Sequence, residues 1–126
     1  MLDRTIPFYN TILRCDYYVR KEVSLPDGFE IVSYQESYEE DWARLEFAIG
    51  DFDSTEEAKS YFVSAYLPDS KKQKDILFLL NPERQVIDSC IAWQDRRGDA
   101  EVSSLHWLVV DELYQGKKLG KAFALL

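Results

Sequence analysis

Alternating apolar and polar residues predict five short strands along this chain. The expected strands are residues 16–23, 29–34, 75–80, 86–93 and 100–110. The last three are joined by the turn-forming segments 81–84 and 95–99, so we expect an antiparallel meander. The final strand becomes apolar on both faces towards its C-terminal end, which is typical of a central strand. Strict alternation places one set of its side chains on a single face: Val102, Ser104, His106, Leu108 and Val110.

Two helices are expected between the second and third strands. Ser37 and Ser54 each open a Ser-x-x-Glu sequence, which is the pattern of a capping box at a helix N-terminus. Apolar residues at helical spacing follow both serines, and Gly50 and Pro68 are placed to end the two helices. A third helix is expected to start near residues 121–126, which are good helix formers.

The composition describes one folded domain. The chain has 126 residues, of which 46% are hydrophobic, so it is long enough and apolar enough to bury a core. It contains no internal repeat and no low-complexity tract. We therefore expect a single domain over residues 1–126.

The charge balance excludes several partners. Fifteen basic residues against 23 acidic ones give a net charge of −8, which argues against nucleic acid because its phosphates require clustered Lys and Arg. The basic cluster at residues 71–74 is predicted to be a solvated loop.

No apolar run approaches the ~20 residues of a membrane-spanning helix, and residues 1–7 lack the features of a secretory signal. We therefore expect a cytoplasmic protein with no nucleic-acid or membrane partner.

Cysteine and histidine are too few to form a metal site. Cys15 and Cys90 stand far apart without a CxxC pattern, so both are expected to be reduced. His106 is the one histidine, and no carboxylates or thiolates are spaced to complete a site with it. We therefore predict no structural metal, and a small apolar core role for Cys90.

The segment after the last strand has the character of a phosphate-binding turn. Residues 115–120 (Gln-Gly-Lys-Lys-Leu-Gly) join a buried strand to a helix, and the glycines allow a ligand to approach the main chain closely. The N–H groups at a helix start and the charges of Lys117, Lys118 and Lys121 favour an anion. A plain strand-to-helix turn with solvated lysines explains the same pattern. The P-loop and dinucleotide-binding patterns are both absent.

Residues 108–122 closely resemble the acetyl-CoA-binding motif of the GNAT superfamily of N-acetyltransferases, Q/R-x-x-G-x-G/A. Gln115 and Gly120 match its first and last defined positions, whereas Lys118 stands where glycine is usual. The order of elements over residues 16–126 is also that of the first part of this fold. The resemblance implies an α+β architecture, with a mixed, mostly antiparallel sheet flanked by helices.

The resemblance also implies a cofactor site for acetyl-CoA. In that family, the strand before the turn offers main-chain groups to the pantetheine arm, usually beside a bulge, and the turn holds the diphosphate. By position, the strand contacts would fall on Leu108, Val109 and Val110. The turn contacts would fall on Gly116, Lys117, Lys118, Leu119, Gly120 and Lys121, with Gln115 opening the turn.

The implied reaction is direct transfer of an acetyl group from acetyl-CoA to a primary amine of a small molecule or peptide. The amine loses a proton and attacks the thioester carbonyl, while a strand N–H stabilises the oxyanion. No catalytic side chain is assigned. Ser104 stands near the position of a general-base glutamate in some relatives and could orient a water. His106 could titrate near neutral pH or serve as a hydrogen-bonded structural residue.

The later elements of the GNAT fold have no counterpart after Leu126. We expect either that the domain is truncated after the start of the diphosphate-binding helix, which we favour, or that a second chain completes the sheet in a homodimer. An alternative function is a non-catalytic acyl-CoA-binding or dimerisation module. A third is an interaction domain without a small ligand.

Overall fold

The computed structural model of this chain describes residues 5, 7, 24–117 and 119, with main chain only at residues 95–97. The strand expected at residues 16–23 and the helix expected near residues 121–126 lie outside this part. The remaining predicted elements are all present, within a few residues of their expected bounds.

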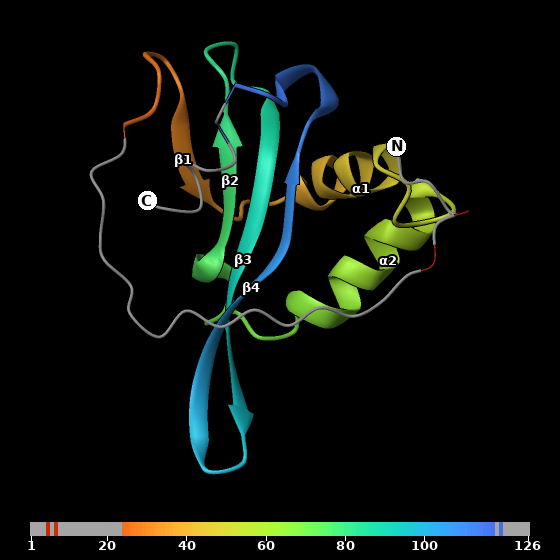
Figure 1. The fold of residues 1–126 in the computed structure, drawn as a ribbon, viewed down its shortest axis with the longest axis vertical. Helices are drawn as coiled ribbons and strands as arrows, with labels where there is room; N and C mark the ends of the chain where they lie inside the picture. Colours follow the sequence, from red (N-terminus) through yellow and green to blue (C-terminus); the bar gives the residue numbers. More distant parts are fainter. Residues whose placement is uncertain (1–4, 6, 8–23, 118, 120–126) are drawn as a thin grey trace.

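Four antiparallel strands form one sheet in the order β1-β2-β3-β4 (Figure 1). Their bounds are β1 Glu30–Ser33, β2 Ile76–Leu80, β3 Val86–Arg97 and β4 Ala100–Val110. The predicted meander of the last three strands is confirmed. Two short 3-10 turns flank it, η1 Gln73–Asp75 before β2 and η2 Glu112–Tyr114 after β4.

The two helices, α1 Tyr38–Ala48 and α2 Thr55–Tyr66, both contribute to a core on one face of the sheet, and Figure 1 shows them beside β4. The predicted cap of α2 is confirmed, because the Ser54 hydroxyl accepts a hydrogen bond from the Glu57 N–H at 3.0 Å. The predicted capping box of α1 is wrong. Ser37 has a φ of 77° and its side chain makes no capping bond.

Gly50 ends α1 as expected. Its φ is 91°, its N–H donates to the Phe47 carbonyl and the Asp51 N–H donates to the Glu46 carbonyl, which is the Schellman arrangement. The left-handed conformation suits glycine, since it carries no Cβ.

Buried side chains form one cluster on each face of the sheet. The helix-side cluster is rich in aromatic rings and centres on Trp42, Phe62 and Phe78, all fully buried. The cluster on the opposite face is smaller, and its buried members are Leu79, Ile87, Cys90 and Leu119. Cys90 is therefore a core residue, as its strand position indicates.

The β3–β4 hairpin extends beyond the rest of the sheet in the lower part of Figure 1. The turn predicted at residues 95–99 is shorter in the structure, because β3 continues to Arg97 and only Gly98 and Asp99 connect the strands. Gly98 has a φ of 64°, which is required at the first central position of a type II′ turn.

A bulge in β4 changes which residues share a face. Ser89 pairs with Val109 and Ile91 pairs with His106, so β4 has one extra residue opposite Cys90. Trp107 lies within this bulge at a φ of 52° and packs on the helix side, as do Ser104 and His106. The prediction that Leu108 and Val110 share this face is therefore wrong. The extra residue shifts the alternation by one position.

Candidate functional site

The C-terminal end of β4 presents main-chain groups on the side away from β3. The Asp111 N–H donates to the Ile87 carbonyl at 2.8 Å, so Val109 and Asp111 direct their main chains towards β3. Val110 faces the opposite edge, where its carbonyl accepts a bond from Gln115 Nε2 at 3.1 Å. Within the described residues, β4 pairs with β3 alone. Val110 thus borders an edge that no other described strand covers, and Leu108 lies in the bulge beside it, whereas the main chain of Val109 faces β3.

The turn η2 follows this edge directly and fixes the direction in which the chain leaves the sheet. The Asp111 side chain accepts from the Leu113 N–H at 2.9 Å, and the Asp111 carbonyl accepts from the Tyr114 N–H at 2.8 Å. The Gln115 N–H donates to the Glu112 carbonyl. The main-chain N–H groups of Tyr114 and Gln115 are therefore used inside the turn.

The next two residues differ in this respect. No acceptor in the described part of the chain bonds the N–H of Gly116 or of Lys117, and both residues are exposed. Gly116 has a φ of 79°, and a Cβ built on it would meet nothing within 4 Å, so the space beside its Cα is open. Unpaired N–H groups beside open space are suited to an anion.

Two further residues complete the described part of the predicted site. Leu119 is buried in the cluster on the face of the sheet opposite the helices, where it anchors the chain after the turn. The ammonium of Lys117 lies 5.2 Å from the centre of the Tyr114 ring, a cation–π contact. Lys118, Gly120 and Lys121 lie outside the described residues.

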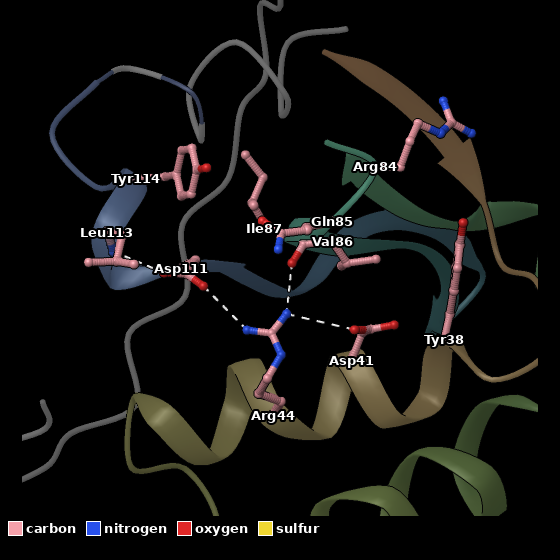
Figure 2. A pocket seen from close by; sticks show the side chains of 10 residues that line it. All are labelled: Tyr38, Asp41, Arg44, Arg84, Gln85, Val86, Ile87, Asp111, Leu113 and Tyr114. Carbon is pink, nitrogen blue, oxygen red and sulfur yellow. Dashed lines mark hydrogen bonds and ion pairs between the residues drawn. The ribbon is translucent and has the colours of Figure 1, made fainter. Parts of the chain in front are cut away.

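A cavity of about 580 Å³ opens beside the same end of the sheet. Figure 2 shows Arg44 pointing into it from α1, towards the main chain of Val86 and the carboxylate of Asp111. The Arg44 guanidinium donates to the Val86 carbonyl at 2.8 Å and to Asp111 Oδ2 at 3.3 Å, and it lies 3.7 Å from Asp41. Burial raises the pKa of Asp41, and the neighbouring Arg44 charge opposes that rise. Arg44 therefore ties α1 to the residue that caps η2.

Ser104 and His106 lie on the helix side of β4, before the bulge. The His106 ring stacks on Trp93 with centroids 5.8 Å apart and an interplanar angle of 27°. Ser104 is opposite Trp93 and lines a cavity of about 330 Å³ that Lys72 also borders. The Lys72 ammonium is 4.6 Å from the Trp93 ring centre. The structure therefore places Ser104 and His106 on the same face of β4, but it assigns neither of them a catalytic role.

Sequence reasoning missed two buried carboxyl groups, Glu46 on α1 and Asp88 on β3. Both are at most 1% exposed, and none of their carboxyl oxygens has a hydrogen-bond partner among the described residues. Burial, with the neighbouring Asp51 carboxyl adding to the effect, raises the pKa of Glu46 to about 9, and burial raises that of Asp88 to about 8. Burial therefore favours the protonated form of both carboxyl groups.

The described residues contain no group of three or more side chains suited to hold a metal ion. In the same part of the chain, no helix is both long enough and apolar enough to cross a membrane.

Comparison with known proteins identifies the fold. No family model matches the sequence, and no curated protein gives a significant match. Among solved structures, an acetyltransferase of the GNAT family from Staphylococcus aureus Mu50 is similar, with a TM-score of 0.53 and 21% identity over 74% of this chain and 60% of that one. This chain therefore spans less than two thirds of that protein's length.

An acetyltransferase of Trypanosoma brucei gives a TM-score of 0.49 and 20% identity, over 77% of this chain and 71% of that one. The similarity to the Staphylococcus aureus structure agrees with the strand order and with the two helices on one face. The chain has the fold of the GNAT-family acetyltransferases.

Proposed function

We propose that this chain is an N-acetyltransferase that transfers an acetyl group from acetyl-CoA to a primary amine. One observation carries the proposal. The outer edge of β4, which no other described strand covers, runs from the Trp107 bulge directly into a turn whose Gly116 and Lys117 N–H groups have no acceptor within the described residues. A free strand edge and a turn suited to an anion, which are the two features an acyl-CoA needs, are therefore adjacent within the described residues.

The residues present fit this cosubstrate. The outward N–H of Val110 is placed to donate to an amide of the pantetheine arm, whereas the Val110 carbonyl already accepts from Gln115 Nε2. The N–H groups of Gly116 and Lys117, with the Lys117 ammonium, offer donors and positive charge to a diphosphate. Lys118, Gly120 and Lys121 would extend the same contacts if the rest of the motif follows the family pattern.

When bound, acetyl-CoA supplies an activated thioester carbonyl for attack by the amine. The outer N–H groups of β4 near the bulge would donate to the charge that develops on the carbonyl oxygen. The aromatic cluster beneath Trp107 holds that stretch of main chain in place, because the Trp107 ring packs on Trp42, Phe52 and Tyr61 at centroid distances of 5.5 to 5.7 Å.

Release of free thiol from acetyl-CoA separates an acetyltransferase from a non-catalytic binding module and from an interaction domain. The chain is incubated with acetyl-CoA and a panel of polyamines, amino acids, aminoglycosides and peptides, and free thiol is measured. An acetyltransferase releases thiol with at least one acceptor. A non-catalytic acyl-CoA-binding module is stabilised by coenzyme A without releasing thiol, and an interaction domain without a small ligand shows neither effect.

The assignment of the turn is tested by Lys117→Ala. We expect the affinity for coenzyme A to fall by up to about fivefold, because one partly solvated contact between an ammonium and a phosphate is lost. Lys71→Ala is the matched control, since Lys71 is an exposed loop lysine remote from this turn in sequence. Equal affinities for the two variants, measured by titration calorimetry, would contradict the assignment.

A further inference from the structure

The turn between β2 and β3 is closed by a fully buried side chain that also reaches the candidate site. Asn81 is 0% exposed, and each polar atom of its amide has a partner. Asn81 Oδ1 accepts from the Gln85 N–H at 2.8 Å, and Asn81 Nδ2 donates to Gln85 Oε1 at 2.9 Å. The second Nδ2 bond goes to the Tyr114 hydroxyl at 3.0 Å, 33 positions later in the chain. Asn81 therefore joins the β2–β3 turn to η2.

Tyr114 receives contacts from three separate parts of the chain. Its hydroxyl is fixed by Asn81, and its ring meets the Phe29 ring edge to face with centroids 6.4 Å apart. Its N–H is bonded to the Asp111 carbonyl. Tyr114 is thus contacted by neighbours before β1, after β2 and at the end of β4, which restrict its ring.

The Lys117 ammonium lies against this fixed ring, at 5.2 Å from its centre. A free lysine side chain samples many rotamers, and confining it on binding costs conformational entropy. A ring that already holds the ammonium beside the turn removes part of that cost before any ligand arrives.

We infer that Asn81 and Tyr114 are positioning residues for the diphosphate turn. Asn81 orients the Tyr114 hydroxyl, the oriented ring holds Lys117, and Gly116 and Lys117 are kept in an open arrangement ready for an anion. This inference rests on the proposed function for its ligand, and it assigns a binding role to a buried amide and a tyrosine that the cofactor motif does not include.

Tyr114→Phe is the direct test, because it removes the hydroxyl and keeps the ring and its packing. The dissociation constants of coenzyme A and of pantetheine, which lacks the diphosphate, are measured for each variant. We expect coenzyme A to bind about threefold to tenfold more weakly and pantetheine to be unaffected, since one buried hydrogen bond is lost at the diphosphate end alone. A purely structural role would weaken both ligands together.

Tyr34→Phe is the matched control. It removes a tyrosine hydroxyl that bonds Glu39 at 2.6 Å, in the helix-side core and away from the turn. The inference is overturned if Tyr114→Phe and Tyr34→Phe bind coenzyme A equally well, or if pantetheine and coenzyme A lose the same factor. The double variant Asn81→Ala/Tyr114→Phe should bind coenzyme A no more weakly than the weaker-binding of the two single variants. Both substitutions remove the same hydrogen bond between Asn81 and the Tyr114 hydroxyl, so their effects on affinity should not add.

Backbone ¹⁵N relaxation of the unliganded chain separates this inference from the proposed function. Tyr114→Phe should lower the order parameters of Gly116 and Lys117, whereas Tyr34→Phe should leave them unchanged. If the order parameters fall but the wild-type chain does not bind coenzyme A, the positioning contact stands and the proposed function is wrong. Unchanged order parameters with normal binding of coenzyme A would contradict the inference alone.

Discussion

The side chain of Glu46 is buried, and burial disfavours the charged form of its carboxyl group. It lies one turn after Trp42 on the buried face of α1, and its carboxyl oxygens have no hydrogen-bond partner in the described structure. Burial, with the neighbouring Asp51 carboxyl adding to the effect, raises its pKa from 4.5 to about 9. Between these two values the folded chain holds a proton that the unfolded chain has released, so the free energy of unfolding falls as the pH rises.

Glu46→Gln should remove this dependence, because glutamine has nearly the same shape and does not titrate. We expect the stability of the variant relative to the wild type to increase steadily as the pH rises from about 5 to about 8.5. Urea denaturation at several pH values in this range measures the difference. A difference that stays constant with pH would show that Glu46 is not protonated in the folded chain.

Single residues also show where sequence reasoning succeeds and where it stops. Gly116 could be identified from sequence, since a glycine after a strand and before a helix has a local meaning that its φ of 79° bears out. Glu46 and Asp88 could not, because each lies among the ordinary residues of an amphipathic element and its burial depends on what packs above it. The pairing of Arg44 with Asp111 spans 67 positions and has no local pattern at all.

At the scale of single elements, the two serines before the helices form a natural comparison. Ser54→Ala should destabilise the chain by about 1 kcal/mol, because the Glu57 N–H loses its capping acceptor. Ser37→Ala should have almost no effect through capping, since the Ser37 side chain makes no such bond. Thermal or urea denaturation compares the two variants. Equal losses would contradict the assignment of the caps.

The bulge in β4 makes a second prediction at this scale. Trp107 has a φ of 52°, a left-handed conformation that costs a residue with a Cβ about 1 to 2 kcal/mol. Trp107→Gly should therefore be more stable than Trp107→Ala by about 1 kcal/mol, although both lose the aromatic contacts.

Trp93, on the neighbouring strand and also partly buried, provides the control for this pair. Its φ is not left-handed, so alanine should be more stable than glycine there by roughly 0.5 to 1 kcal/mol. Urea denaturation of the four variants gives both differences. If the glycine variant were more stable than the alanine variant at both positions, or less stable at both, the result would contradict the bulge.

The elements themselves were largely predictable from sequence, but the bulge was not. Period-2 alternation located β4 at its observed bounds, and the Ser-x-x-Glu pattern placed both helix starts. Alternation alone assumes an unbroken pleat, so it assigned Leu108 and Val110 to the wrong face. An inserted residue is visible only through the register against the partner strand, in which Ser89 and Ile91 face Val109 and His106.

At the scale of the whole molecule, the ties between distant segments determine the site. Arg44 joins α1 to Asp111 and Asn81 joins the β2–β3 turn to Tyr114, so both faces of the sheet are connected to the residues between β4 and Gly116. The sequence pattern predicted the meander and the two helices, and the resemblance to the GNAT superfamily implied how they pack. It could not predict these ties, which depend on side chains that meet only in the folded chain.

The central claim is that the main chain from Val110 to Lys117 receives a coenzyme with a diphosphate. Titration of coenzyme A into the ¹⁵N-labelled chain, followed by amide NMR, tests it most directly. We predict saturable shifts of the Val110, Gly116 and Lys117 amides, with much smaller shifts at β1 and α2. Unchanged resonances for these three amides at saturating coenzyme A would contradict the account.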